Sequence, residues 1–370
     1  MNKKVAIILI NYKDYAEKYL GDFLVSFAKQ DYKGEMKLFI VDNETSESSF
    51  NTINTMVETR HASSLQNVEI IRNQTNDGFA KGNNDAMTLA LEQGYDHIIL
   101  FNMDTILASD CVSKMVEAAD RTPPILPFDK GEGKIGCVQA RLMLWPDMEK
   151  INSLGNSTHF LGFGYCEGYN NEFSIFNFQF SIKEICYPSG AAVLFKKELL
   201  EKIGLFNEEY WMYNEDQEIG WRTWLSGYKC ILASDAVAYH KYEFSRSITK
   251  YYWMDRNRII SILLCYHLLT LIFIAPAFII MEFGLLLFAW RGGWLKEKIR
   301  VYKYFLSIKN WKLLFATRKK NQGLRQVKDR DIIKMFSGKI SYQEIDSPLL
   351  KLANFFLNIY WQIIKVIIFW

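Results

Sequence analysis

The stretch from His97 to Thr105 constrains the fold of this chain more than any other. Its letters are HIILFNMDT, an apolar run too short for a typical helix that ends in an amide, a carboxylate and a hydroxyl. That pattern is typical of a buried parallel strand whose carboxyl end opens into a cleft. Ligands of open α/β sheets bind in such crevices. The alternative is an ordinary strand followed by an Asn/Asp turn that caps the next helix.

Two polar residues of this stretch, Asn102 and Asp104, are separated by a single residue. On an extended backbone their side chains therefore point to the same side. Two oxygen donors placed in this way can hold a divalent cation, and the cation can hold a diphosphate. The spacing therefore favours a metal-assisted phosphate site at the end of this strand.

Apolar runs alternate with helix-like stretches over the first hundred residues. The runs are 5–10, 38–41, 68–71 and 97–101, and the helix-like stretches are 15–29, 48–60 and one that opens at the loop 76–84 and ends near 93. Strands that alternate with helices through short connections predict a doubly wound, mostly parallel, Rossmann-like sheet. Parallel strands would bring the polar residues that follow each run to one edge of the sheet.

The pattern changes further along the chain. We expect strands at 135–140, 189–195, 230–232 and 236–239, helices at 197–203 and from about 216 to 226, and a surface loop at 123–133. Between 151 and 187, glycines and aromatic residues alternate without a helical period, which indicates short antiparallel strands or a flap.

Composition indicates a packed globular body. The chain has 370 residues, of which 49% are hydrophobic and 23% charged, so disorder is not favoured. The six cysteines are scattered without CxxC or CxxH spacing, which indicates buried thiols in a reducing compartment. The first apolar run is too short for the core of a signal peptide, so we expect the N-terminal body in the cytoplasm.

The last third of the chain has two apolar stretches, 259–290 and 349–370, around a basic segment. Residues 291–334 hold fourteen basic and three acidic side chains, so this segment carries +11 and the rest of the chain −8. A single crossing by 259–290 would place the basic segment outside, against the positive-inside rule. We expect instead a bent apolar helix pair, broken at Pro276, that lies in the inner leaflet with the basic segment on anionic headgroups. Packing in an oligomer is the alternative, and no nucleic-acid motif accompanies the basic residues.

Seven short motifs follow one another along the chain. They are Asn11-Tyr12, Asp42-Asn43, Asn76-x-Gly78-Phe79-Ala80, Asn102-x-Asp104, Ser189-Gly190-Ala191, Glu215-Asp216 and His240. In this order they resemble the family 2 glycosyltransferases of GT-A fold, and more narrowly the bacterial rhamnosyltransferase-like branch, over about residues 4–258. The resemblance implies a catalytic domain at 1–258 and inverting sugar transfer from a nucleotide-diphosphate donor, usually with a divalent metal. The apolar and basic pattern described above predicts a helical membrane-association region at 259–370.

The resemblance also implies roles for individual residues. It places the catalytic base on Asp216, with Glu215 orienting it or touching the donor sugar, and Mn²⁺ or Mg²⁺ on Asp104 and His240. The residues that it assigns to substrate binding are Asn11, Tyr12, Asp42, Asn43, Asn76, Gly78, Phe79, Lys81, Asn83, Asn102 and Trp211. Where the family has Asp-x-Asp, this chain has Asn102-x-Asp104, which leaves one anionic metal ligand.

Several of these residues also have an ordinary structural explanation. The loop 76–84 lacks the motifs of a P-loop and of a dinucleotide fold, so it either offers N–H groups and Lys81 to phosphate at a helix N-terminus or forms a turn capped by Asn83. Asn214 can cap the next helix and place Glu215 and Asp216 in its first turn, where the helix dipole keeps a carboxylate ionised. An ordinary acidic first turn has the same pattern.

The leading hypothesis is a membrane-associated glycosyltransferase at the cytoplasmic face of the cell membrane. It would move a sugar, with dTDP-rhamnose as one specific donor, to a glycan or polyprenyl-linked acceptor in cell-surface polysaccharide assembly. The main alternative is a catalytically silent scaffold that binds sugar nucleotides and membrane. A nucleotidyltransferase is disfavoured because the loop after the first strand contains no glycine. A second copy of the chain is a further candidate partner.

Overall fold

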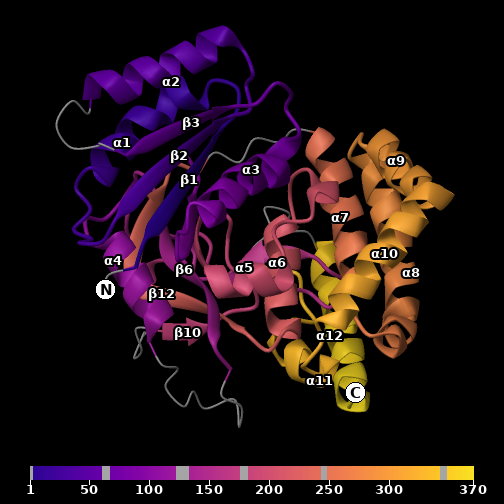
Figure 1. Cartoon of the computed structure of the whole chain (residues 1–370). Coiled ribbons are helices and arrows are strands. Elements are labelled where there is room, and N and C mark those ends of the chain that lie inside the picture. The colour runs from indigo at the N-terminus through magenta and orange to yellow at the C-terminus, as the bar shows by residue number, and fades with distance from the viewer. Residues whose placement is uncertain (1–2, 61–66, 122–132, 176–181, 243–247, 342–347) are drawn as a thin grey trace.

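The computed structural model describes residues 3–60, 67–121, 133–175, 182–242, 248–341 and 348–370 (Figure 1). Its main sheet has the strand order β10-β12-β6-β11-β4-β1-β2-β3, with β5 paired to β12 and β7 to β6. The strands are β1 (Val5–Asn11), β2 (Met36–Asp42), β3 (Val68–Arg72), β4 (His97–Phe101), β5 (Thr105–Leu107), β6 (Ile135–Leu144), β7 (Ile151–Ser153), β10 (Ile182–Glu184), β11 (Ala192–Lys196) and β12 (Lys229–His240).

Helices cover both faces of this sheet, because the apolar strands bury side chains on each side. One core joins α1 (Gly21–Phe27), α2 (Glu47–Arg60) and α4 (Cys111–Asp120) to residues such as Ile7 and Ile40. The other joins α3 (Gly78–Glu92), α5 (Lys197–Ile203) and α6 (Glu215–Leu225) to their neighbours Ile8 and Phe39. Alternate residues of one strand thus enter opposite cores, as expected of a sheet covered twice.

Strands β3, β2, β1 and β4 run parallel. Strand β11 is antiparallel to both of its neighbours, β4 and β6. The sheet is therefore mixed rather than uniformly parallel. Because β11 runs the opposite way, its start at Ser189-Gly190-Ala191 lies at the edge where β4 ends, and the N–H of Asn102 donates to the carbonyl of Ala191 (3.0 Å).

Several boundaries differ from those expected. The two short strands predicted at 230–239 are one strand, β12, with an irregular register between Ala233 and Val237. The helix predicted from about 216 begins at Glu215 as α6, and a 3₁₀ turn at Glu208–Tyr210 precedes it. The first helix opens as a π-helix at Ala16–Leu20. Short strands do fill the described part of 151–187, including β8 (Asn156–Thr158) and β9 (Gly164–Cys166). The loop expected at 123–132 lies outside the described residues.

The C-terminal region is helical and packs beside the sheet (Figure 1). Its helices are α7 (Thr249–Cys265), α8 (Leu268–Arg291), α9 (Leu295–Phe305), α10 (Ile308–Gly323), α11 (Asp329–Ile332) and α12 (Pro348–Ile367). Helix α7 runs through the predicted domain boundary at residue 258 and contacts both α6 and α10.

The prediction of a break at Pro276 is wrong. Helix α8 continues through Pro276, which lies on the exposed side of the helix. The chain breaks instead at Tyr266 and His267, both extended, where the His267 N–H donates to the carboxylate of Asp329 (2.8 Å). Residues 259–265 therefore belong to the largely buried helix α7. Among the described residues, α8 is the helix long and apolar enough to cross a membrane, by length and composition only.

Candidate active site

The ends of β1 and β2 meet in a buried polar cluster. One carboxylate oxygen of Asp42, Oδ1, accepts hydrogen bonds from Asn11 Nδ2 (2.8 Å), the Ser49 hydroxyl (2.9 Å) and the Glu44 N–H (3.1 Å). The Oδ1 atom of Asn11 accepts the Ala16 N–H at the start of the next helix (2.8 Å). The other oxygen of Asp42, Oδ2, is buried and has no hydrogen-bond partner in the described part of the chain. Asp42 thus has one carboxylate oxygen without a partner in the described residues, while Asn11 holds the local fold.

A pocket of about 360 Å³ lies beside this cluster. Ser49, which binds both Asn11 and Asp42, is part of its wall. The other residues around the pocket are Lys13, Asp14, Ala16, Glu17, Glu44, Ser46, Ser48 and Thr52. Tyr12 is exposed nearby in sequence, with Lys13 above its ring.

Asn43 and the start of α3 hold each other in place. The Asn43 amide donates to the Gly78 carbonyl (3.1 Å) and its Oδ1 accepts from Asn73 (2.8 Å). Asn76 accepts the N–H of Gly78 (3.1 Å), which completes a tight turn. These contacts explain the amide residues of this loop as structural supports.

Two other residues of the loop are engaged within α3. Lys81 forms an ion pair with Asp85 one turn later. Asn83 is buried and donates to the carbonyl of Phe79 (2.9 Å). Asn83 is not a cap, because α3 begins at Gly78 with Asp77 preceding it; that alternative was wrong.

Asp104 and His240 meet at the ends of β4 and β12. His240 Nε2 lies 3.1 Å from Asp104 Oδ1, and His240 Nδ1 lies 3.0 Å from Asn152 Oδ1. All three side chains are buried. An amide oxygen only accepts, so Nδ1 donates to Asn152 and this bond orients the ring with Nε2 facing the Asp104 carboxylate. An imidazole nitrogen and a carboxylate oxygen that lie this close can share a proton or can both bind one cation.

The donor set therefore fits a divalent metal in chemistry, with an imidazole, a carboxylate and an outer amide that fixes the ring. No group of three His, Cys, Asp or Glu side chains that could hold a metal occurs among the described residues. A metal at Asp104 and His240 would need its remaining ligands from elsewhere, for example from a diphosphate.

Asp216 lies at the start of α6 against the motif Ser189-Gly190-Ala191. Its carboxylate accepts the N–H of Gly190 (3.3 Å) and the N–H of Gln217 (2.8 Å). Burial raises the pKa of Asp216 to about 6, although both hydrogen bonds lower it. Burial, with the charge of Asp216 second, raises the pKa of Glu215, whose Oε2 has no partner among the described residues.

Burial opposes the expected effect of the helix dipole on these two acids. Desolvation disfavours the charged form more than the helix start favours it. Asn214 does precede the helix, but its side chain makes no capping bond and donates to Gln217 Oε1 (2.8 Å). A carboxyl with a pKa raised towards neutrality is what a general base needs.

The loop before Asp216 is strained. Trp211, Tyr213 and Asn214 all have positive φ angles, of 59°, 68° and 64°. The Trp211 carbonyl accepts the N–H of Ala80 (3.1 Å), and the Trp211 ring stacks on Trp253 of α7 with centroids 4.8 Å apart. Strained backbone of this kind persists only where its surroundings hold it.

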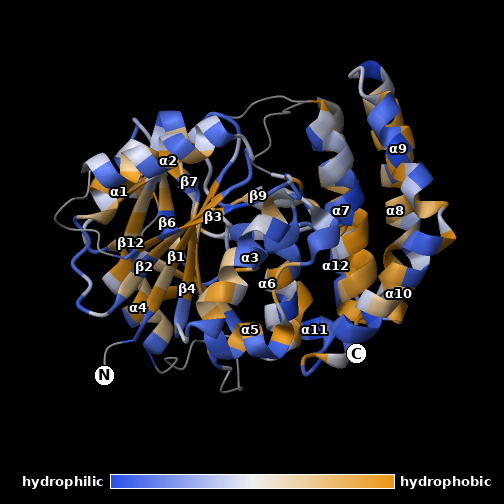
Figure 2. Cartoon of the chain, turned by 45° about the horizontal axis from the view of Figure 1, so that its top comes forward, coloured by the Kyte–Doolittle hydropathy of each residue, from blue (hydrophilic) through white to orange (hydrophobic). Residues whose placement is uncertain are grey.

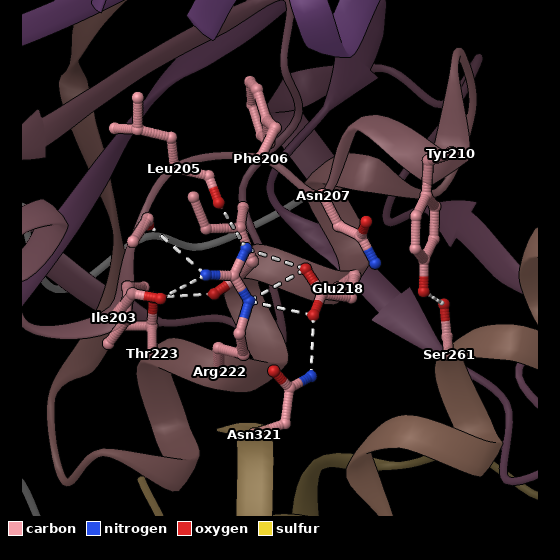
Figure 3. Close-up of polar contacts among 12 residues, drawn as sticks. Ile203, Leu205, Phe206, Asn207, Tyr210, Glu218, Arg222, Thr223, Ser261 and Asn321 are labelled. Carbon is pink, nitrogen blue, oxygen red and sulfur yellow. Dashed lines mark hydrogen bonds and ion pairs between the residues drawn. The ribbon is translucent and has the colours of Figure 1, made fainter. Parts of the chain in front are cut away.

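A buried ion pair fixes α6 behind the loop (Figure 3). Arg222 pairs with Glu218 (2.8 Å) and donates to the carbonyls of Ile203 (2.6 Å) and Leu205 (2.8 Å). Asn321 of α10 donates to the same Glu218 (2.8 Å), so the C-terminal region braces the helix that carries Asp216.

Contacts along the sheet edge link Phe79, Asp216 and Asn102 through the motif Ser189-Gly190-Ala191. Phe79 lies against Gly190, which binds Asp216, and the next residue, Ala191, binds Asn102. Sequence reasoning missed Ser49, Asn152, the N–H of Gly190 and Trp253. Asn152 lies 88 residues from its partner, and no local pattern marks it.

Known proteins resemble this chain in sequence and in fold. The family described as Glycosyl transferase family 2 matches residues 6–204, more than half of the chain. No curated protein matches the chain.

Solved structures match the fold at low identity. The crystal structure of GalNAc-T7 with UDP, GalNAc and Mn²⁺ has a TM-score of 0.51 and 12% identity, over 71% of this chain and 48% of that one. The chain thus spans about half the length of GalNAc-T7. The crystal structure of S. aureus TarS 1–349 in complex with UDP has a TM-score of 0.48 and 16% identity, over 98% of this chain and 90% of that one. Mannosyltransferase PcManGT from Pyrobaculum calidifontis with GDP-Man and Mn²⁺ has a TM-score of 0.48 and 13% identity, over 99% and 88%. The predicted fold class is confirmed.

Proposed function

The chain belongs to glycosyl transferase family 2, and from this premise we propose that it transfers a sugar from a nucleotide-diphosphate donor to a lipid-linked glycan. The observation that supports the proposal is strand direction: Asp42 lies at the end of β2, Asp104 and His240 follow the ends of β4 and β12, and Asp216 binds the residues before the antiparallel strand β11, all at one edge of the sheet. These groups offer, in order, an acceptor for a base, ligands for a cation and a proton acceptor.

The donor would lie along the carboxyl edge of β2, β1 and β4. Its base would meet Asp42 Oδ2, which is the unsatisfied acceptor beside the 360 Å³ pocket. A buried acceptor without a partner is costly unless a ligand supplies the donor. Neighbouring structures hold UDP and GDP-Man, which supports a nucleotide sugar; dTDP-rhamnose is our specific candidate because the motif order resembles the rhamnosyltransferase-like branch.

Chemistry would be an in-line displacement with inversion. Asp216 takes the proton of an acceptor hydroxyl, the hydroxyl oxygen forms a bond to the anomeric carbon, and the bond from that carbon to the diphosphate oxygen breaks. The nucleoside diphosphate leaves with the electron pair. Glu215 lies beside Asp216 and is more deeply buried, and burial together with the charge of Asp216 raises its pKa.

Asp104 and His240 would hold Mn²⁺ or Mg²⁺, with Asn152 orienting the imidazole. A cation bound there neutralises charge on the departing diphosphate. Two protein ligands leave positions for diphosphate oxygens, so we expect metal and donor to bind together.

Membrane association is part of the same proposal. Helices α8 and α12 expose apolar side chains at the end of the molecule away from the sheet (Figure 2); we name this surface the α8–α12 face. On α8 the exposed residues include Ile272, Ile280 and Phe283, and on α12 they include Phe355, Ile363 and Val366. Exposed basic residues follow on α9 and α10. An apolar face of this size beside basic side chains suits an anionic cytoplasmic leaflet.

A donor panel tests the proposal. Thermal shift with UDP-GlcNAc, GDP-mannose and dTDP-rhamnose, with and without Mn²⁺, is followed by transfer to a short polyprenyl-diphosphate-linked sugar. We expect metal-dependent stabilisation by one donor and transfer from that donor. Stabilisation without transfer or hydrolysis under any condition would favour the silent scaffold instead, for which Asn102 in place of an acidic ligand is the supporting feature.

A further inference from the structure

The sequence Asp255-Arg256-Asn257-Arg258 lies in the middle of α7, and all four side chains are buried. Charged and amide side chains are buried only where they find partners. Both arginines make their contacts inside the protein. Most partners of the four residues fall into two groups. One group is the loop 209–214 before Asp216, which we call the catalytic loop, and the other is the C-terminal helices α8 and α9.

Asn257 faces the catalytic loop. Its Nδ2 lies 2.9 Å from the carbonyl of Tyr210, 2.9 Å from that of Met212 and 2.7 Å from that of Tyr213. One amide group thus gathers three carbonyls of the segment that contains the positive φ angles. Without this amide the carbonyls of Met212 and Tyr213 would lose their side-chain donor, whereas the Tyr210 carbonyl would keep the Met212 N–H (2.6 Å).

Arg256 fixes the orientation of that amide. Its Nε and Nη2 donate to Asn257 Oδ1 at 3.0 and 2.8 Å, so the amide oxygen is occupied and the NH₂ group must face the loop. The same guanidinium donates to the carbonyl of Glu209 and lies over the ring of Trp253 (4.5 Å). Arg256 therefore holds both the loop and the tryptophan on which Trp211 stacks.

Asp255 and Arg258 face the other way. Arg258 pairs with Asp255 (2.7 Å) and with Glu282 of α8, while Lys298 of α9 reaches Asp255 and Glu282 at 2.6 Å each. Arg258 also donates to the carbonyl of Leu161 (3.0 Å). These buried charges lock α7 to α8 and α9.

We propose that Asn257 is a positioning residue for catalysis: with Arg256, it holds the strained loop 210–214 so that Asp216 meets the acceptor hydroxyl. This rests on the proposed function for the identity of Asp216 as base. The anchor formed by Asp255 and Arg258 makes α7 the rigid link between the C-terminal helices and the loop. Misplacement of a catalytic group by about 1 Å can lower a rate about 100-fold.

The test uses Asn257→Asp, which keeps the shape and removes the donors, and Asn257→Ser, which keeps one donor. Thr270→Val is the matched control, because Thr270 is a buried hydrogen-bonded residue of α8 that pairs with Asp329, away from the loop. The readouts are amide hydrogen exchange of residues 207–216, UDP affinity, and kcat against pH with the most active donor of the panel.

We expect Asn257→Asp to speed exchange in 207–216 and to lower kcat about 100-fold with UDP affinity within about twofold. Its rate profile should also move to a lower apparent pKa, because water entering the loosened loop relieves the burial that raises the pKa of Asp216. Asn257→Ser should be intermediate, and Thr270→Val should match the wild type. Unchanged exchange and kcat in Asn257→Asp, or equal losses in Thr270→Val, would overturn the proposal.

The two proposals can fail separately. A wild type that transfers no sugar contradicts the proposed function, and the exchange measurement still decides whether Asn257 holds the loop. If Asn257→Asp does not fold, Asn257→Ser decides: altered exchange in 207–216 with a reduced kcat supports the role, and wild-type values exclude it.

Discussion

The backbone of Trp211 lies directly on Gly78: a methyl group added to Gly78 would meet the Trp211 carbonyl oxygen at 2.4 Å. Gly78 has a φ of +94° at the start of α3, and the next turn donates the Ala80 N–H to the same carbonyl. The glycine of the loop 76–84 thus seats the loop that leads to Asp216. Gly78 is therefore needed because the backbone of Trp211 approaches it too closely for a side chain to fit.

Gly78→Ala should therefore destabilise the protein and loosen the loop. The positive φ lowers the free energy of unfolding of this variant by about 1–2 kcal/mol. The contact with Trp211 forces the loop to move and lowers it by a further ~1–3 kcal/mol. Gly94→Ala is the control, because Gly94 has φ +82° with nothing within 4 Å of the added methyl. Denaturant unfolding of the two variants measures the difference. Equal losses would mean that the contact with Trp211 carries no weight.

We expect kcat to decrease as the pH is lowered through about 6. Burial raises the pKa of Asp216 to about 6, and a general base must be ionised, so kcat falls as pH drops through that value. An Asp at its ordinary pKa would keep full activity down to about pH 4–5. The measurement is kcat from pH 4.5 to 8 at saturating donor. A flat profile across pH 5–7 would contradict the buried-base assignment.

Asn152 should matter for the metal although it would not touch it. Its Oδ1 fixes the Nδ1 proton of His240 (3.0 Å), so Asn152→Ala should weaken Mn²⁺ binding in the presence of UDP by about 10–100-fold. Asn156→Ala is the matched control, since Asn156 binds Ser153 (2.9 Å) and not the histidine. Electron paramagnetic resonance of Mn²⁺ reports binding directly. Similar affinities in the two variants would argue against a metal on His240.

The α8–α12 face should bind membranes. Ile280 and Phe283 are 71% and 67% exposed on α8, and replacing both with Glu removes apolar area and adds charge. We expect sedimentation with vesicles containing anionic lipid to drop at least about tenfold, and wild-type binding to weaken as salt rises. Val25→Glu on α1 is the control at an exposed apolar site elsewhere. If the double variant still bound vesicles as the wild type does, the α8–α12 face would be excluded as the membrane-binding surface.

Much of the fold was predictable because short apolar runs and helical periods report burial directly. Strands β1 to β4 and the first three helices appear where the hydrophobic pattern predicts them. The polar residues at strand ends were also predictable, because strand direction alone sends them to one edge. Whether Asp42, Asp104 and His240 bind substrate and metal stays a prediction.

The rest depends on contacts between residues far apart in the sequence. The α7–α8 break follows from Asp329 binding the N–H of His267, 62 residues away, whereas Pro276 is harmless on the exposed side of α8. The pKa of Asp216 follows from burial that the acidic first turn does not reveal. Asn257 serves a loop 44 to 47 residues earlier, and its neighbours in sequence suggest only charge.

The most direct test of the account is Asp216→Asn, measured for both donor binding and transfer. The amide keeps the shape and accepts the Gly190 N–H but cannot take a proton at neutral pH. We predict nucleotide-sugar affinity within about threefold of the wild type and a kcat lowered at least about 100-fold, while Asp235→Asn, at an exposed position of β12, behaves as the wild type. Full transfer by Asp216→Asn would contradict the assignment of the base and, with it, the mechanism proposed for this site.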